Sequence, residues 1–285
     1  MTKPAGIQPF STARFMIYIG MDSTRMYALV TGASGGIGRQ FARQLADQGK
    51  PCILVARDSA RLAAVLAELP EPARSLSVAM PSDLSAQGAA ASLYAACRDK
   101  GIVVDLLVNN AGSGVFGPSL SVDPPGVAAM IGLNVTALTT LCQLFGADMK
   151  ARGTGQILNV GSFAGLNATP FFASYAATKS YVLNYSLALR AELAGSGVRV
   201  TCLLPGYVRT GFDEHAGIVS EAYKKFSIAN SLAADVVARI GLRAMDGRSA
   251  FVIAGGRNRF AAFLFGLLPR TAPPAIMKRF LDSLV

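Results

Sequence analysis

Residues 31–38 read Thr31-Gly32-Ala33-Ser34-Gly35-Gly36-Ile37-Gly38, and they join an apolar run at 27–31 to a segment with apolar residues at helical spacing. Glycines allow such a turn to be tight and let backbone N–H groups approach a pyrophosphate at the helix N-terminus, where the dipole favours negative charge. A purely structural turn is the alternative. In this position the stretch predicts a dinucleotide-binding unit at the start of the fold.

Beyond this turn, short β-type runs alternate with helical patterns along the chain. The predicted strands are residues 27–31, 52–56, 76–80, 106–109, 156–160, 199–204 and 251–254. They are continuously apolar, as in Ile53-Leu54-Val55, which is typical of parallel strands buried on both faces. The alternation predicts a Rossmann-type, doubly wound α/β fold with a mainly parallel seven-stranded sheet. We expect one catalytic domain over residues 26–256.

Composition narrows the class of protein. Hydrophobic residues make up 52% of the 285 and charged residues 15%, which favours a compact fold over disorder. The four cysteines, Cys52, Cys97, Cys142 and Cys202, are widely spaced, and His215 is the one histidine. This pattern predicts buried, reduced thiols in a cytoplasmic protein and no metal site. The net charge of +10 is scattered, which favours an anionic cofactor or membrane surface over nucleic acid.

The two ends of the chain differ from the middle. Residues 1–25 are predicted to be a flexible extension, or to precede a true start at Met21 or Met26. Residues 257–285 contain an apolar stretch, 260–268, that is too short to cross a membrane. Five basic residues accompany it against Asp282, namely Arg257, Arg259, Arg270, Lys278 and Arg279. This tail could rest on an anionic membrane surface, close over a hydrophobic substrate or pack on a second subunit.

Arg57 follows the second predicted strand, about 20 positions beyond the glycines, where NAD-preferring folds carry an acidic residue for the ribose 2′-hydroxyl. A guanidinium at this position suits a 2′-phosphate. In the alternative, Arg57 is a solvated loop residue and Asp58 faces the ribose. The residues favour NADP(H) over NAD(H).

Tyr175 and Lys179 lie four positions apart in a helical pattern, so they share a helix face. A nearby ammonium stabilises a phenolate and lowers the phenol pKa. Ser162 ends the fifth predicted strand, at the sheet edge where ligands bind, and its hydroxyl can hydrogen-bond a substrate carbonyl. A tyrosine and a lysine at this spacing often form an ordinary helix surface, and the position after strand five favours a proton-transfer site.

The chain resembles the short-chain dehydrogenase/reductase (SDR) family over about residues 27–256. The matching markers are residues 31–38, Asp83-Leu84, Asn109-Asn110-Ala111-Gly112, Asn134, Ser162, Tyr175, Lys179, Pro205-Gly206 and Thr210. The resemblance implies a catalytic set of Asn134, Ser162, Tyr175 and Lys179, in which Asn134 anchors a water that links Lys179 to solvent. It also implies that Asn109 ties the central strands together. Gly35 departs from the family, since NADP-preferring members often have a basic residue there.

The resemblance further implies a set of cofactor contacts. These are Gly32, Ser34, Gly35, Gly36, Ile37, Gly38, Arg57, Asp83, Leu84, Asn110, Gly112, Tyr175, Lys179, Pro205, Gly206, Val208 and Thr210. Residues 207–231 correspond to the variable lid of the family; with Phe212, Ile218, Val219, Tyr223 and Phe226 they line an apolar pocket or simply cover the cofactor.

The predicted function is NADP(H)-dependent interconversion of a carbonyl and a secondary alcohol, on an apolar ketone such as an oxoacyl or steroid-like substrate. The alternative is a non-catalytic NADPH-binding sensor or scaffold, in which one or more of Ser162, Tyr175 and Lys179 would be expected to be replaced. Epimerisation or dehydration on the same fold usually requires a larger C-terminal domain. The expected partners are a small-molecule substrate and one or three further copies of the chain, in a homodimer or homotetramer. Localisation is expected to be cytoplasmic, with peripheral membrane contact through residues 257–285.

Overall fold

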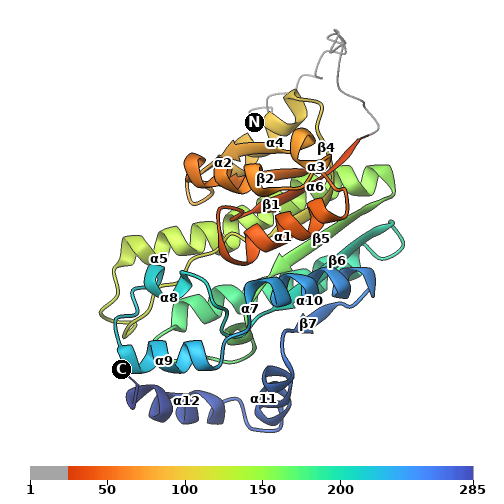
Figure 1. The fold of residues 1–285 in the computed structure, drawn as a ribbon. Coiled ribbons are helices and arrows are strands. Elements are labelled where there is room, and N and C mark those ends of the chain that lie inside the picture. The colour runs from red at the N-terminus through yellow and green to blue at the C-terminus, as the bar shows by residue number, and fades with distance from the viewer. Residues whose placement is uncertain (1–24, 285) are drawn as a thin grey trace, which may run out of the picture.

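The computed structural model describes residues 25–284, apart from the side chain of His215 (Figure 1). The extension predicted at residues 1–25 therefore lies outside the described residues, except for Arg25. From Met26 onward strands and helices alternate, as the sequence predicts. The tail beyond residue 256 forms two further helices.

The centre of the fold is a seven-stranded sheet in the order β3-β2-β1-β4-β5-β6-β7, with every neighbouring pair parallel. The strands are β1 Met26–Thr31, β2 Cys52–Ala56, β3 Val78–Pro81, β4 Val103–Asn109, β5 Gly155–Val160, β6 Val198–Leu204 and β7 Phe251–Ile253. This confirms the predicted Rossmann-type, doubly wound sheet. The order reverses between β1 and β4, and ligands of open α/β sheets bind at such a switch point.

The structure corrects the predicted starts of two strands, β3 and β4. Leu76 is not in β3, because it ends the short helix α3, Ala73–Leu76. Ser77 separates the two elements by donating to the carbonyl of Ala73 over 2.7 Å and accepting from the amide of Cys52 over 2.8 Å. The fourth strand begins at Val103, three residues earlier than predicted. Asp105 had interrupted the apolar run, and in the structure it pairs with Lys50 over 2.6 Å.

Helices cover both faces of the sheet. One face carries α1 Gly36–Asp47, α2 Ser59–Glu68 and α10 Ala234–Asp246, and the other carries α4 Ala89–Asp99, α6 Leu138–Arg152 and α7 Ala173–Glu192. Two apolar clusters, one on each face, form the core. All four cysteines are buried free thiols, as predicted for these side chains.

The helical stretch Pro124–Arg152 is long and apolar enough to cross a membrane by length and composition alone. It consists of α5 Pro124–Ile131, a π-helical turn η1 Gly132–Ala137, and α6. The buried side chains of α6, among them Leu141 and Phe145, belong to the core cluster on one face of the sheet. We therefore interpret the stretch as a core helix of the α/β domain.

The remaining elements gather beyond the carboxyl ends of the strands. They are the 3-10 turn η2 Phe163–Leu166, the lid helices α8 Phe212–His215 and α9 Glu221–Ala229, and the tail helices α11 Gly256–Gly266 and α12 Ala272–Asp282. Helices α9 and α12 lie side by side in Figure 1, and the rings of Phe226 and Phe280 join them with centroids 4.9 Å apart. The tail thus packs in part on the domain itself.

Candidate active site

The glycine turn between β1 and α1 forms an open cradle at the helix N-terminus. Gly32 and Gly36 have φ values of +66° and +52°, which favour glycine. A Cβ on Gly38 would overlap the carbonyl oxygen of Gly32 and lie 2.5 Å from Nδ2 of Asn110. A Cβ on Gly35 would meet nothing within 4 Å, and no side chain in the described part of the chain caps this end of α1. This geometry fits an anionic phosphate.

Asn110 braces this cradle from the end of β4. Its Nδ2 donates to the carbonyl oxygen of Thr31 over 2.9 Å, and the Thr31 hydroxyl accepts from the backbone amides of Asn110 and Ala111. One residue earlier, Asn109 donates to Oδ1 of Asn159 over 2.9 Å and so links β4 to β5. The implied role of Asn109 as a tie between the central strands is confirmed.

Arg57 directly follows β2, the strand that pairs with β1 ahead of the glycine turn. Arg57 is exposed, and within residues 25–284 it has no ion-pair partner. Asp58 caps α2 instead, because its Oδ1 accepts from the amide of Arg61 over 2.9 Å while its other oxygen pairs with the Arg61 guanidinium. Near the end of β3, hydrogen bonds from Ser85 lower the pKa of Asp83, and Arg57 lowers it further. The neighbouring Leu84 turns its side chain into the core.

Ser162, Tyr175 and Lys179 come together at the carboxyl end of β5. Ser162 follows the strand and accepts from the amide of Ala164 over 3.1 Å, and its hydroxyl hydrogen-bonds Tyr175. Lys179 lies one turn along α7, with Nζ 5.8 Å from the centroid of the Tyr175 ring. Its ammonium is buried and donates to the carbonyl oxygen of Val160 over 2.9 Å. The structure thus assembles the three predicted side chains.

The electrostatics correct one part of the prediction. Burial raises the pKa of Tyr175 to about 12, and the hydrogen bond from Ser162 offsets only part of this rise. The Lys179 ammonium is directed at the carbonyl oxygen of Val160. Burial instead lowers the pKa of Lys179 to about 8. Without a ligand, the phenol therefore stays protonated at neutral pH and the lysine remains mostly cationic.

Asn134 lies in the π-helical turn η1 and holds this region together. Its Oδ1 accepts from the amide of Ser113 over 3.0 Å, while Nδ2 donates to the Ser113 carbonyl and to the hydroxyl of Thr178. A Cβ on Gly112 would lie 3.2 Å from both Asn134 Oδ1 and Lys179 Nζ, so these two polar atoms face one space. Ser113 and Thr178 were missed in the sequence because neither has a distinctive pattern.

The loop after β6 closes the opposite side of the cradle. Thr210 lies so close that a Cβ on Gly36 would be 2.9 Å from its methyl carbon. Val208 forms a parallel bridge with Leu232, which anchors the loop ahead of α10. A Cβ on Gly206 would lie 2.9 Å from Cγ of Asn258, so α11 begins directly against this loop. Of the predicted residues of this loop, Thr210 therefore lies against the glycine turn, and Gly206 lies against the start of α11.

Aromatic side chains surround Tyr175. The rings of Phe172 and Phe212 lie 5.5 and 5.4 Å from its ring, centroid to centroid. Their cluster also contains buried Ile218, Tyr223 and Leu281. Leu281 comes from α12, within the tail for which closure over a hydrophobic substrate was one of the roles predicted. Val219 was predicted to line an apolar pocket with other lid residues, but it is 84% exposed and does not belong to this cluster.

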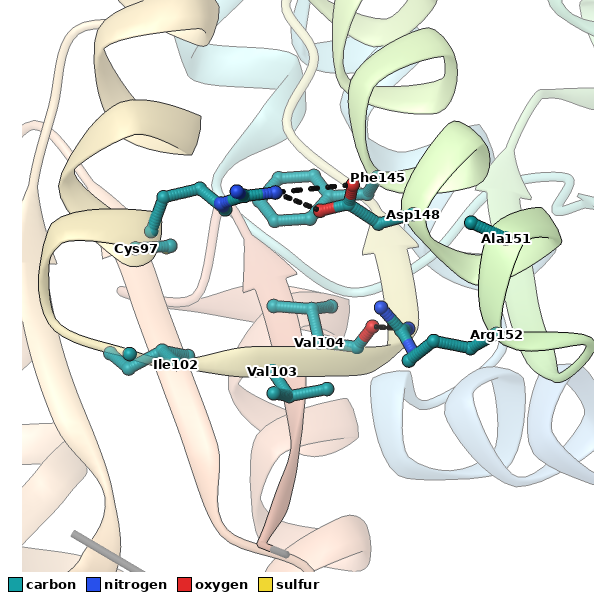
Figure 2. A pocket seen from close by; sticks show the side chains of 10 residues that line it. Cys97, Ile102, Val103, Val104, Phe145, Asp148, Ala151 and Arg152 are labelled. Atoms are coloured by element: carbon teal, nitrogen blue, oxygen red, sulfur yellow. Dashed lines mark hydrogen bonds and ion pairs between the residues drawn. The ribbon is translucent and has the colours of Figure 1, made fainter. Parts of the chain in front are cut away.

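A separate cavity of about 300 Å³ lies at the amino ends of the strands, between α4, α6 and the start of β4 (Figure 2). Arg98 pairs there with Asp148 over 3.4 Å, and Arg152 donates to the carbonyl of Val104 over 2.7 Å. Because Val103 begins β4 and Asn109 ends it, this cavity is a strand's length away from the carboxyl edge of the sheet. The candidate active site is the group of residues gathered at that carboxyl edge.

Comparison with known proteins agrees with this geometry. The family model for short chain dehydrogenase matches residues 26–217, which span the glycine turn, Ser162, Tyr175 and Lys179. The chain is a short-chain dehydrogenase/reductase. As a member of this family it is a Rossmann-fold oxidoreductase, an enzyme that acts on CH–OH and C=O groups.

Individual SDR relatives act on different substrates. Galactitol 2-dehydrogenase (L-tagatose-forming) from Cereibacter sphaeroides is 38% identical over 64% of this chain and 71% of its own length. Ketoacyl reductase HetN from a Nostoc species is 30% identical over 74% of each chain. The short-chain dehydrogenase of Sphingobium yanoikuyae, solved in complex with NADPH, has a TM-score of 0.74 and 30% identity, covering 86% of this chain and 97% of its own. Similar solved SDR structures also include a complex with NAD.

Proposed function

We propose that this protein is an NADP(H)-dependent reductase of apolar ketones in which Tyr175 is the proton donor. The observation that carries the proposal is the meeting of Ser162, Tyr175 and Lys179 beside the glycine cradle. A bound nicotinamide cofactor supplies the hydride for the carbonyl carbon. The Ser162 hydroxyl hydrogen-bonds the substrate oxygen, and Tyr175 transfers its phenolic proton to that oxygen.

Lys179 and Asn134 complete the proton path. The buried ammonium of Lys179 stabilises the phenolate left on Tyr175 once the proton has gone. Asn134 faces the same space as Lys179 beside Gly112, where a water can pass protons from solvent. Both side chains are almost fully buried, which keeps bulk water away from the reacting groups.

The preference for NADP(H) is supported by Arg57. Its guanidinium is exposed directly after β2 and free of ion pairs within the described residues, whereas Asp58 is occupied as the cap of α2. A 2′-phosphate would gain a charge-assisted hydrogen bond with Arg57. Gly35 contributes no charge, so Arg57 carries most of this recognition.

The proposed substrate class follows from the aromatic side chains that pack against Tyr175. Phe172 and Phe212 flank the reactive phenol, and Phe116 packs against Phe172 with centroids 5.0 Å apart. Such walls favour an apolar body next to the carbonyl, as in an oxoacyl chain or a steroid. A polar sugar alcohol would leave its hydroxyls without partners among these rings.

We also propose a homodimer or homotetramer in the cytoplasm, assembled through the long helices. Ile131 on α5 and Tyr181 on α7 are both about 40% exposed, and these helices contact each other. Tyr181 stacks on Tyr185, which widens the apolar surface. Light scattering would test this assembly, and a monomer at micromolar concentration would contradict it.

The decisive experiment compares Tyr175→Phe with Tyr181→Phe, a control on the same helix. Both variants are assayed with NADPH and NADH against ketones, aldehydes, quinones and 3-oxoacyl thioesters. Tyr175→Phe should lower turnover by about 10²- to 10⁴-fold while NADPH affinity stays nearly unchanged. Tyr181→Phe should behave as wild type. Substantial turnover by Tyr175→Phe contradicts the proton-donor role, and NADPH binding without turnover of any carbonyl in the wild type favours a sensor.

A further inference from the structure

The first tail helix, α11, leaves its apolar residues uncovered. None of its eleven residues is buried, although the helix contains three phenylalanines and a leucine. Phe260, Phe263 and Leu267 are 64%, 63% and 67% exposed, and Leu264 is 43% exposed. Spacings of three and four residues place these side chains on one helix face. We call this face, Phe260, Phe263, Leu264 and Leu267, the α11 stripe.

Positive charge flanks the stripe at both ends. Arg257 and Arg259 lie in the first turn of α11, and Arg270 follows its end. Residues 247–281 contain no aspartate or glutamate. Within the described part of the chain, these three arginines have no ion-pair partner, and the one acid of the tail, Asp282, is paired with Lys278. The stripe is thus an apolar patch with unneutralised cations around it.

We propose that the α11 stripe docks this enzyme on an anionic membrane surface. A helix of eleven residues is about 16 Å long, too short to span a bilayer, so it would lie in the interface with its rings among the acyl chains. The arginines would remain at the level of the anionic headgroups. A second copy of the same surface would bring like charges together, which disfavours it as the occupant.

The docking face has a fixed relation to the active site. Asn258, in the first turn of α11, donates to the carbonyl of Ala254 over 2.6 Å and packs against Gly206 at the end of β6. The stripe therefore belongs to a helix that begins directly against the loop after β6, at the carboxyl edge of the sheet. The stripe itself contains no residue of the catalytic set, so vesicle binding tests it separately from the proposed reaction.

The test is sedimentation of the full-length protein with phosphatidylcholine vesicles, with and without about one quarter phosphatidylserine. One variant, Phe260→Ser/Phe263→Ser/Leu267→Ser, removes the apolar face. Another, Arg257→Gln/Arg259→Gln/Arg270→Gln, removes the charge. The matched apolar control is Met26→Ser/Phe251→Ser, which changes exposed apolar residues at the amino ends of β1 and β7. The matched charge control is Arg43→Gln/Lys100→Gln/Lys150→Gln, which changes exposed cations outside the tail.

We expect the wild type and both controls to bind the anionic vesicles and to bind phosphatidylcholine alone much more weakly. Each stripe variant should lose about tenfold or more in vesicle affinity and keep the wild-type melting temperature, because no buried residue is changed. Absence of wild-type binding overturns the proposal, as does wild-type binding by the stripe variants or an equal loss in the cation control. Unchanged vesicle binding with a smaller oligomer in the apolar variant would identify a second copy as the occupant and also overturn it.

Discussion

The side-chain amide of Asn134 donates a hydrogen bond to the hydroxyl of Thr178 over 3.0 Å. Thr178 in turn donates to the carbonyl oxygen of Tyr175 over 2.7 Å, within the first turns of α7. The π-helical turn that holds Asn134 is therefore connected to the backbone of the proposed proton donor. Thr178 touches no reacting atom, so we interpret it as a positioning residue.

Replacing Thr178 by valine should lower kcat by about tenfold, because the Asn134 amide loses its acceptor and the start of α7 loses a constraint. The KM for the carbonyl substrate should change little. Thr178→Ser keeps the hydroxyl and should restore most of kcat. Steady-state kinetics of the two variants decide the question, and an equal loss in both would point to a packing role for the methyl group.

Replacing Gly38 by alanine should weaken cofactor binding by more than about tenfold, because the new Cβ overlaps the Gly32 carbonyl and forces the turn open. Gly266→Ala, at the end of α11 and outside the glycine turn, is the control, because its Cβ meets nothing within 4 Å. Fluorescence titration with NADPH measures both, and thermal melting reports the cost of strain, about 1–3 kcal/mol for Gly38→Ala. Similar losses in the two variants would contradict the steric explanation.

Replacing Arg57 by alanine should raise the Kd for NADPH by about tenfold or more and leave that for NADH nearly unchanged. The physical reason is that only NADPH carries the 2′-phosphate. Arg43→Ala, an exposed cation on α1, controls for the general loss of positive charge. An equal effect on both cofactors would instead place Arg57 on a shared part of the dinucleotide.

The pH dependence follows from the buried lysine. Lys179 is cationic below its pKa of about 8, so its charged fraction falls as the pH rises through that value. The kcat/KM for reduction should therefore decrease above about pH 8, since the ammonium stabilises the developing phenolate. Tyr175, with a pKa of about 12, stays protonated over this range and does not contribute. A kcat/KM profile between about pH 6 and pH 10 measures this, and a flat profile would contradict the assignment.

Helix α12 should prove part of the substrate pocket. Leu281 is buried in the aromatic cluster, and Ser220 of the lid donates to the carbonyl oxygen of Leu284 at the end of α12. Leu281→Ala should destabilise this packing by about 2–5 kcal/mol and raise KM for apolar ketones. Ile276→Ala, on the exposed side of the same helix, should change neither. Melting curves and KM values for a long-chain and a short ketone provide the comparison.

Local sequence was sufficient for the sheet and for much of the site. Continuous apolar runs and the glycine turn predicted all seven strands. The largest errors in their ends arose at Asp105, a charged residue that pairs with Lys50 inside β4, and at Leu76, an apolar residue that ends a helix. Tyr175 and Lys179 are neighbours along one helix, and Ser162 ends a strand. Their meeting follows from the rule that parallel strands present their carboxyl ends at one edge.

The sequence by itself determined the fold class, the family and the chemistry of the proposed proton donor, because these depend on short-range patterns. Only the tertiary structure decided that burial raises the Tyr175 pKa and that Lys179 is directed at Val160. It alone joined Thr178 to Asn134 and brought Leu281 to the lid, and it showed that α11 is uncovered. Each of these depends on contacts between segments far apart in the chain, and on exclusion of water that no local pattern records.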